Sequence, residues 1–341
     1  MYHLRVNGRG NAWPIQIGKH HAMYQEDEIN DYANASFSIC KSKNTSYNKH
    51  ELDWEVLIDA GHGTIPFILN HHNRLPEAII LTHAHFDHTL GADWIVQSYF
   101  RQNKKAYPIY ASKACMNAFN TVFHHLEGLV EWIILEVGIK TPIIQSPGLY
   151  VTAFPVFHGY SAKGASMLLF SQENSDKQVL ISGDILCPLI KQEDYSKLNN
   201  IDLLIADCNN RFPYPKTNHW SFIAKENELA LLSKFYNKFE FVNILKPHFD
   251  SDIEKCYVLD LISEINDTKE LYWSLSDFIK KVNPTTTALV HYSGSEDEKY
   301  YNEKIMTTEE LEYWANSKIQ ESNTSSQFIV PKTGDVYSIF Q

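Results

Sequence analysis

Residues 82–88 read THAHFDH and place three imidazoles and one carboxylate close together. They follow directly on a short apolar, β-branched run of the kind that forms a buried strand. In an extended segment, side chains at positions i and i+2 point the same way, so His83 and His85 can converge on one ion. The turn that follows re-aims Asp87 and His88, which can serve a second ion. Because imidazole and carboxylate groups suit zinc, manganese or iron, this segment predicts a transition-metal site.

Further ligands must come from elsewhere in the chain, because four residues in one loop cannot fill two metal sites. Ligand-type residues stand where several other apolar, strand-like runs end. A lone histidine at a strand end is more often structural, but several such ends together indicate one shared site. The candidates are His158 after the run 151–157, Asp184 after 179–181, and His291 after 288–290.

The elements that must position these residues are strands followed by strands alternating with helices, which favours sheets covered by helices. The stretch 122–148 is apolar but irregular, and its secondary structure is left open. A mostly helical stretch is expected at about 221–281, with one strand at 239–245. The final segment, FIVPKTGDVYSIF, looks like a hairpin with its turn at 333–335.

These motifs together resemble the metallo-β-lactamase fold superfamily: THAHFDH at 82–88, the single His158, ISGD at 181–184 and LVHYSG at 289–294. The resemblance implies an α/β (α+β) fold, an αββα sandwich of two mixed β-sheets flanked by helices. The metals would lie at one edge between the sheets. It also implies two divalent ions, Zn²⁺ in the first place, with Mn²⁺ or Fe as alternatives. Carried over residue by residue, His83, His85 and His158 would hold one ion and Asp87, His88 and His291 the other, with Asp184 bridging them.

Two segments are similar to the phosphodiesterase side of the superfamily, which includes ribonuclease Z and the cyclic phosphodiesterase of phosphonate breakdown. One is the opening, GRGNAWP followed by NASFSI at 34–39, and the other is ADCNNRFPYPKTNHWSF at 206–222. The second match puts His219 at the position of the family's catalytic histidine, where it would protonate the departing alkoxide. A helix-capping or structural role is the alternative for His219. Asp87 and Asp184 would also belong to the catalytic group.

Other residues near these loops are candidates for contact with substrate. His62 lies in the DAGHG turn, where the loop of this superfamily approaches the metals. Trp220 and Tyr292 could stack on a base or ring, although aromatic side chains pack cores more often. Asp207 could orient a ligand from behind it.

We therefore expect a dinuclear metal-dependent hydrolase, foremost a phosphodiesterase that cleaves a small or cyclic phosphodiester through a metal-bridging hydroxide. A lactonase or thioesterase using the same hydroxide is the alternative enzyme. A tRNA 3′-processing endonuclease and a metal-binding protein without catalysis are further alternatives.

Two differences between this sequence and these families bear on the choice of substrate. The family of the cyclic phosphodiesterase carries an additional cysteine-bound zinc near its N-terminus, and residues 8–33 contain no cysteine. The segment between His219 and His291 is longer than expected for ribonuclease Z. We interpret the chain as a single domain, 1–341, with a helical insertion at about 226–270. This insertion could cover the site or form a subunit contact, which leaves a homodimer open.

Composition narrows the class of partner. The formal net charge is −11, which disfavours nucleic acid because phosphate contacts need clustered Lys and Arg. The 44% of hydrophobic residues suffices for a core, but no apolar run is long enough to span a membrane. The five cysteines are scattered and form no close pair. With no secretory signal at the start, this pattern predicts a reducing, cytoplasmic location.

Overall fold

The computed structural model describes residues 1–25, 28–44, 46–215, 217–223, 257, 259–261, 263–264, 272–320 and 324–340. The predicted strand at 239–245 lies outside the described residues. All but a few residues of the predicted insertion at 226–270 lie outside them as well.

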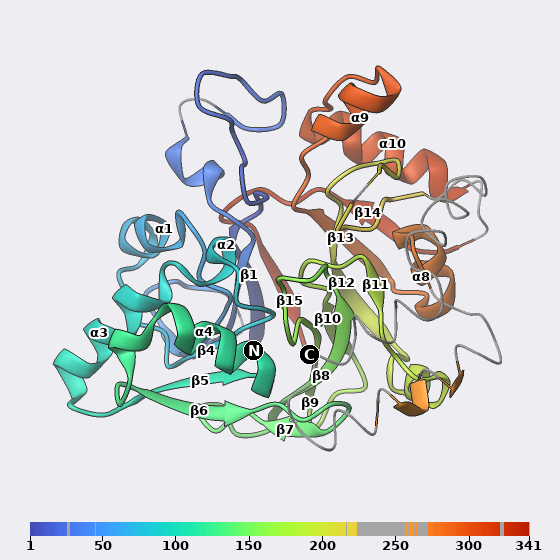
Figure 1. Cartoon of the computed structure of the whole chain (residues 1–341). Helices are drawn as coiled ribbons and strands as arrows, with labels where there is room; N and C mark the ends of the chain where they lie inside the picture. Colours follow the sequence, from blue (N-terminus) through green and yellow to red (C-terminus); the bar gives the residue numbers. More distant parts are fainter. Residues whose placement is uncertain are drawn as a thin grey trace.

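The first sheet is formed by the N-terminal half of the chain together with the last strand (Figure 1). Its pairs are antiparallel from β15 to β3 and parallel from β3 to β6. It is therefore a mixed sheet. In order across the sheet, the strands are β15 (Val336–Ile339), β1 (Tyr2–Gly8), β2 (Ser36–Ser42), β3 (Leu52–Ile58), β4 (Ala78–Ile80), β5 (Tyr107–Ala111) and β6 (Val130–Ile134).

The second sheet is formed by the C-terminal half and is also mixed. Antiparallel pairs join β8, β9 and β10, whereas β10, β12, β13 and β14 run parallel. A short strand, β7 (Lys140–Pro142), pairs with β8. In order across the sheet, the strands are β11 (Cys187–Pro188), β8 (Leu149–Phe157), β9 (Ser166–Gln172), β10 (Gln178–Ile181), β12 (Ile201–Asp207), β13 (Thr286–Val290) and β14 (Gln327–Ile329).

Helices cover the outer face of each sheet, so the chain forms four layers with three cores. One core lies between the sheets, one under the N-terminal helices and one under the C-terminal helices. The predicted αββα sandwich is confirmed. The helices are α1 (Thr64–His71), α2 (Phe86–Thr89), α3 (Ala92–Asn103) and α4 (Lys113–Val122) on one side, and α8 (Leu275–Val282), α9 (Ser295–Tyr301) and α10 (Thr308–Gln320) on the other.

Apolar residues in succession along the central strands reflect burial on both faces. In β12, Leu203 and Ile205 point into the core between the sheets, while Leu204 points into the core under the C-terminal helices. Because alternate side chains of a strand face opposite sides, a strand covered on both sides must be apolar throughout. These runs could therefore be recognised as strands from their sequence.

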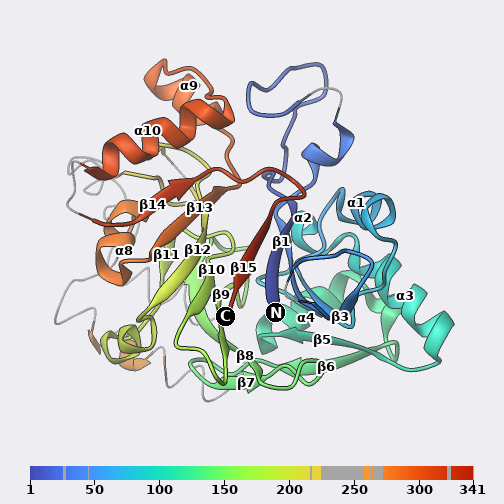
Figure 2. The same cartoon turned by 180° about the vertical axis from the view of Figure 1, so that it is seen from behind.

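The end of the chain differs from the predicted hairpin. β14 pairs with β13 in the second sheet, whereas β15 pairs with β1 in the first (Figure 2). The predicted turn does form, with Gly334 at a φ of 98°. It carries the chain from one sheet to the other, because each strand finds its partner at a different sheet edge.

The undecided stretch 122–148 contains β6, β7 and a short 3₁₀ turn at His124–Leu126. Four of the five cysteines are buried free thiols: Cys40, Cys115, Cys187 and Cys208. Within the described residues, no helix is both long and apolar enough to cross a membrane.

Candidate metal centre

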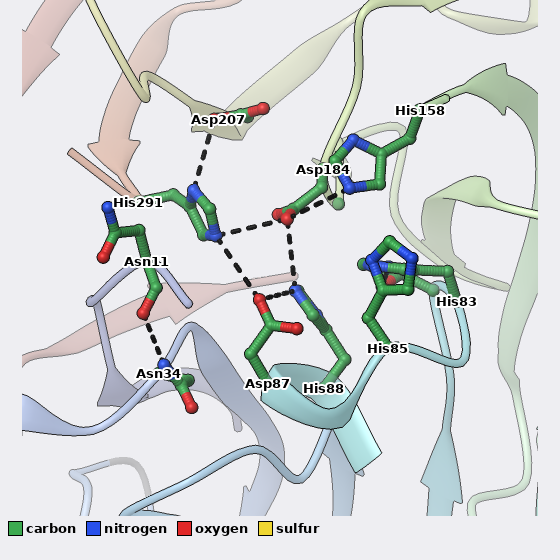
Figure 3. Close-up of polar contacts among 12 residues, drawn as sticks. Asn11, Asn34, His83, His85, Asp87, His88, His158, Asp184, Asp207 and His291 are labelled. Carbon is green, nitrogen blue, oxygen red and sulfur yellow. Dashed lines mark hydrogen bonds and ion pairs between the residues drawn. The ribbon is translucent and has the colours of Figure 1, made fainter. Parts of the chain in front are cut away.

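The predicted ligands meet where strands of both sheets end (Figure 3). The segment after β4 supplies His83 and His85 and then enters α2, which carries Asp87 and His88. The other three come from the second sheet, where β8, β10 and β13 run in the same direction, so their carboxyl ends share one edge. His158 follows β8, Asp184 follows β10 and His291 follows β13.

Three imidazoles form the first group, His83, His85 and His158, whose ligand-type atoms all lie within 4.8 Å of one another. The Nε2 atom of His83 is 3.1 Å from Nδ1 of His85. The ring of His158 lies 5.0 Å from the ring of His83, measured between centroids. Two of the three are almost fully buried, with His83 at 0% and His158 at 1% exposure.

A second group surrounds Asp184 and consists of Asp87, His88, Asp184 and His291. Oδ2 of Asp184 is 3.4 Å from Nε2 of His88 and 3.2 Å from Nε2 of His291. The same oxygen is 3.6 Å from Nε2 of His158, which belongs to the first group. Asp184 therefore touches both groups, as expected of a bridging ligand.

These spacings fit a shared cation better than direct hydrogen bonds. Two ligand atoms held about 2.1 Å from one tetrahedral ion are separated by about 3.4 Å. The separations around Asp184 range from 3.2 to 3.6 Å. Moreover, Nε2 of His88 and Nε2 of His291 are buried without a hydrogen-bond partner. A buried imidazole nitrogen in that situation costs free energy unless it binds an ion or water.

In several of these histidines, the ring nitrogen that faces away from the cluster makes a hydrogen bond. Nδ1 of His158 is 2.8 Å from the carbonyl oxygen of Asn218. Because a carbonyl only accepts, Nδ1 must carry the proton, which leaves Nε2 free as a ligand. Nδ1 of His88 lies 2.7 Å from the Asp59 carboxylate in the same way. Such partners orient metal-binding imidazoles in known sites.

The electrostatics of the cluster favour a cation. Burial, together with neighbouring histidines, lowers the pKa of His83 and of His158 well below its ordinary value. Burial opposes charge on His291 too, but the Asp184 and Asp87 carboxylates outweigh it and raise the pKa of His291 to about 10. The pKa of Asp184 is held well below its usual range despite burial, because His291 and His88 face it. A divalent ion held by His88 and His291, whose pKa values are raised, would therefore compete with protons for these two rings.

Asp59, at the end of β3, was not among the predicted site residues. It accepts hydrogen bonds from the backbone N–H and the hydroxyl of Thr82, at 2.8 and 2.6 Å, besides contacting His88. Its position could have revealed it, because it follows β3, which runs parallel to the neighbouring strand β4. The following loop packs on the metal segment so closely that a Cβ on Gly61 would lie 1.7 Å from the carbonyl oxygen of Asp87.

Two site residues have unusual backbone conformations. Asp59 has a φ of 56° and His291 a φ of 65°, both in the left-handed region that residues other than glycine seldom adopt. The His291 N–H is held by a hydrogen bond to the carbonyl of Arg9 at 2.7 Å. At the end of a strand, this conformation turns the chain sharply and directs the side chain into the cluster. Such strain is concentrated at functional sites.

His219 lies against the cluster and is 9% exposed. Its ring is 4.6 Å from the ring of His158 and 5.0 Å from that of His291, measured between centroids. Nδ1 of His219 is 2.7 Å from Oδ2 of Asp207, and the other oxygen of Asp207 is 3.7 Å from Nδ1 of His291. Asp207 also accepts the backbone N–H groups of Ile185 and Asn209. It thus holds the ring of His219, the predicted catalytic histidine, by a hydrogen bond and lies beside His291, one of the predicted ligands.

The three predicted substrate contacts have different outcomes. His62 is exposed and lines a groove that also includes His85 and Asp87. Trp220 instead lies in the core at 1% exposure and donates its indole N–H to the Asp207 carbonyl at 2.8 Å. Tyr292 is also 1% exposed, and its hydroxyl accepts the Met306 N–H. Both aromatics pack behind the site, so the structure does not support contact with substrate.

Several comparisons place the chain among known proteins. The family described as "Beta-lactamase superfamily domain" matches residues 55–237. No curated protein matches the sequence. Among solved structures, a diphosphatase from the PhnP family is similar over 100% of this chain and 98% of its own, with 16% identity and a TM-score of 0.59.

Two more structures have the same fold at low identity. Yeast PDE1 is 11% identical, with a TM-score of 0.54 over 98% of each chain. Human tRNase Z, short form, is 12% identical, with a TM-score of 0.51 over 99% of this chain and 100% of its own. These proteins share the predicted fold and include the branch that the motifs resemble. The family match covers more than half of the sequence, and the chain belongs to the beta-lactamase superfamily.

Proposed function

We propose that this protein is a dinuclear metal-dependent phosphodiesterase acting on a small phosphodiester. The observation that carries the proposal is the junction of two ligand groups at Asp184, with His219 packed against both. The donor set, imidazoles and carboxylates, suits Zn²⁺, with Mn²⁺ or Fe as alternatives. His83, His85 and His158 would hold one ion, and Asp87, His88 and His291 the other, with Asp184 between them.

When bound, two such ions supply a nucleophile from water near neutral pH and neutralise the charge that develops on phosphoryl oxygens. The protein's own residues must then handle the leaving group. An alkoxide is a poor leaving group, and proton donation to it is typically worth about 10²- to 10⁴-fold in rate. His219 is the side chain placed for this role: Nδ1–H donates to Asp207, and in the imidazolium form Nε2 carries the proton that passes to the leaving alkoxide, which leaves a neutral ring.

Asp207 fixes the orientation of that ring. Its carboxylate contacts Nδ1 of His219, and its other oxygen faces His291. Backbone N–H groups hold the carboxylate itself at 3.1 and 3.2 Å. A buried, doubly anchored carboxylate cannot rotate freely, so we assign Asp207 a positioning role and His219 the catalytic one.

Phosphoryl chemistry is preferred over carboxylic ester chemistry for two reasons. The similar structures named above are a diphosphatase, a tRNase Z and a PDE1, and the first two names state action on phosphorus–oxygen bonds. In addition, the segment 206–222 brings Asp207 and His219 to the cluster, and it was this segment that resembled the phosphodiesterase branch. A lactonase would also release an alkoxide and remains the alternative enzyme.

A parallel substrate screen tests the proposal. Purified protein is analysed for metal content and then assayed with bis-p-nitrophenyl phosphate and with a panel of lactones and thioesters. We expect about two metal ions per chain and hydrolysis of the diester that is abolished by a chelator and restored by Zn²⁺ or Mn²⁺. Hydrolysis of a lactone or thioester with no cleavage of the diester would refute the phosphodiesterase assignment.

A further inference from the structure

A groove of about 530 Å³ opens beside the metal centre and shares His85 and Asp87 with it. A volume of this size accommodates a small organic molecule. Most of its lining comes from three parts of the chain, the loop around residues 12–13, the segment 84–90 and the end of α4 at residues 118–122, and Asn34, His62 and Ser161 complete it. A molecule reacting at the cluster would therefore have one of its groups in this groove.

The walls of the groove are mostly apolar and are left open to solvent. Trp13 is 78% exposed and Phe86 58%, while Leu90 and Val122 are each more than 40% exposed. Large apolar side chains grouped in this way around a polar centre mark a binding surface. Among the described residues of this lining, the polar side-chain groups other than those of the predicted ligands are those of His62, Asn34 and Ser161 and the indole N–H of Trp13.

The charged residues of the groove indicate which kind of substrate group it can bind. The described residues that line the groove include no Lys or Arg, and their one carboxylate is the predicted metal ligand Asp87. Recognition of phosphate chains or a polynucleotide backbone depends on Lys and Arg. The composition of this groove is unsuited to such an anionic group. It suits an uncharged group that buries Trp13, Phe86 and Val122.

We propose that this groove binds an uncharged apolar arm of the phosphodiester, preferably an aromatic ring stacked on Trp13 or Phe86. The inference rests on the proposed phosphodiesterase function and narrows its substrate class to diesters with one such arm. Aromatic rings pair with Trp and Phe by offset stacking or edge contacts, in addition to the free energy of burial.

Binding measured without turnover tests this arm directly. Calorimetry of the metal-loaded protein compares phenylphosphonate with methylphosphonate, which differ only in the arm. We expect phenylphosphonate to bind about tenfold more tightly or better. Trp13→Ala and Val122→Ser should each bring the two dissociation constants closer together. Ile144→Ser, a control at a residue that is 66% exposed and outside the groove, should leave their ratio unchanged.

Turnover is measured in parallel with phenyl p-nitrophenyl phosphate and methyl p-nitrophenyl phosphate, which share a leaving group. A higher kcat/KM for the phenyl diester, reduced by Trp13→Ala, supports the assignment. Equal binding of the two phosphonates would overturn it, even with rapid hydrolysis of both diesters. Tighter binding of phenylphosphonate with no diester hydrolysis would instead refute the phosphodiesterase function and retain the apolar subsite.

Discussion

Replacement of His219 by Ala tests whether this residue is a proton donor or a metal ligand. The ligand-type atoms of His158, Asp184 and His219 all lie within 4.8 Å of one another, so His219 is close enough for either role. As a general acid, it contributes about 10²- to 10⁴-fold, or about 3 to 5 kcal/mol of the activation barrier. The variant should therefore lose that factor on substrates with alkoxide leaving groups and keep about two metal ions per chain.

The leaving group makes this test specific. p-Nitrophenolate departs without needing a proton, whereas methoxide requires one. His219→Ala should consequently slow cleavage of dimethyl phosphate far more than cleavage of methyl p-nitrophenyl phosphate. Asp207→Asn should show the same difference to a smaller extent, because a neutral amide no longer stabilises the imidazolium form of His219 that donates the proton. Initial rates can be followed by NMR for the first diester and by absorbance for the second.

A matched control and a refuting result complete the design. His125 is exposed and pairs with Asp93 away from the cluster, so His125→Ala should change neither rate. Loss of metal from His219→Ala would show that its role is ligation. An equal decrease for both leaving groups, with metal retained, would also contradict the general-acid assignment.

Three further predictions concern the metal and the fold. Removal of metal by a chelator should abolish activity and lower Tm, because buried imidazole nitrogens lose their partner; calorimetry with and without metal measures this. Gly61→Ala should decrease the metal content, since its Cβ would collide with the backbone of Asp87. Gly128→Ala should keep the metal, because its Cβ meets nothing within 4 Å, although the φ of 76° at this position costs some stability. Burial opposes ionisation of Glu55, but Arg5 lowers its pKa from 4.5 to about 2. The resulting stability, about 3 kcal/mol, should be fully present above about pH 4.5 and lost as the pH falls toward 2. Urea unfolding between pH 7 and 3 checks this slope, which Glu55→Gln should flatten.

Much of the site was predictable because its residues follow local rules. A β-branched run ending in ligand-type residues predicts both a strand and a functional end, as at His83, His158, Asp184 and His291. His219 was found through the motif around it rather than by periodicity. Asp59 was missed because a single carboxylate in a glycine-rich turn has no distinctive spacing.

Two predicted aromatic contacts and the predicted C-terminal hairpin show what short segments of sequence do not reveal. Trp220 and Tyr292 stand next to site residues in the sequence, but both side chains are buried in the core under the C-terminal helices. The segment 327–339 contains two strands and a turn, which locally resemble a hairpin. Their partners, β13 and β1, are more than 30 residues away in the sequence, and the turn alone does not reveal them.

The sequence by itself determined which ligand-type residues are present and at which strand ends they lie. It did so because ligand type and strand period are properties of short segments. Only the tertiary structure decided that Asp184 lies between two ligand groups, that Asp207 contacts both His219 and His291, and that an uncharged apolar groove opens beside them. These relations join segments distant in the sequence, and they arise only when the strands of both sheets end at the same edge.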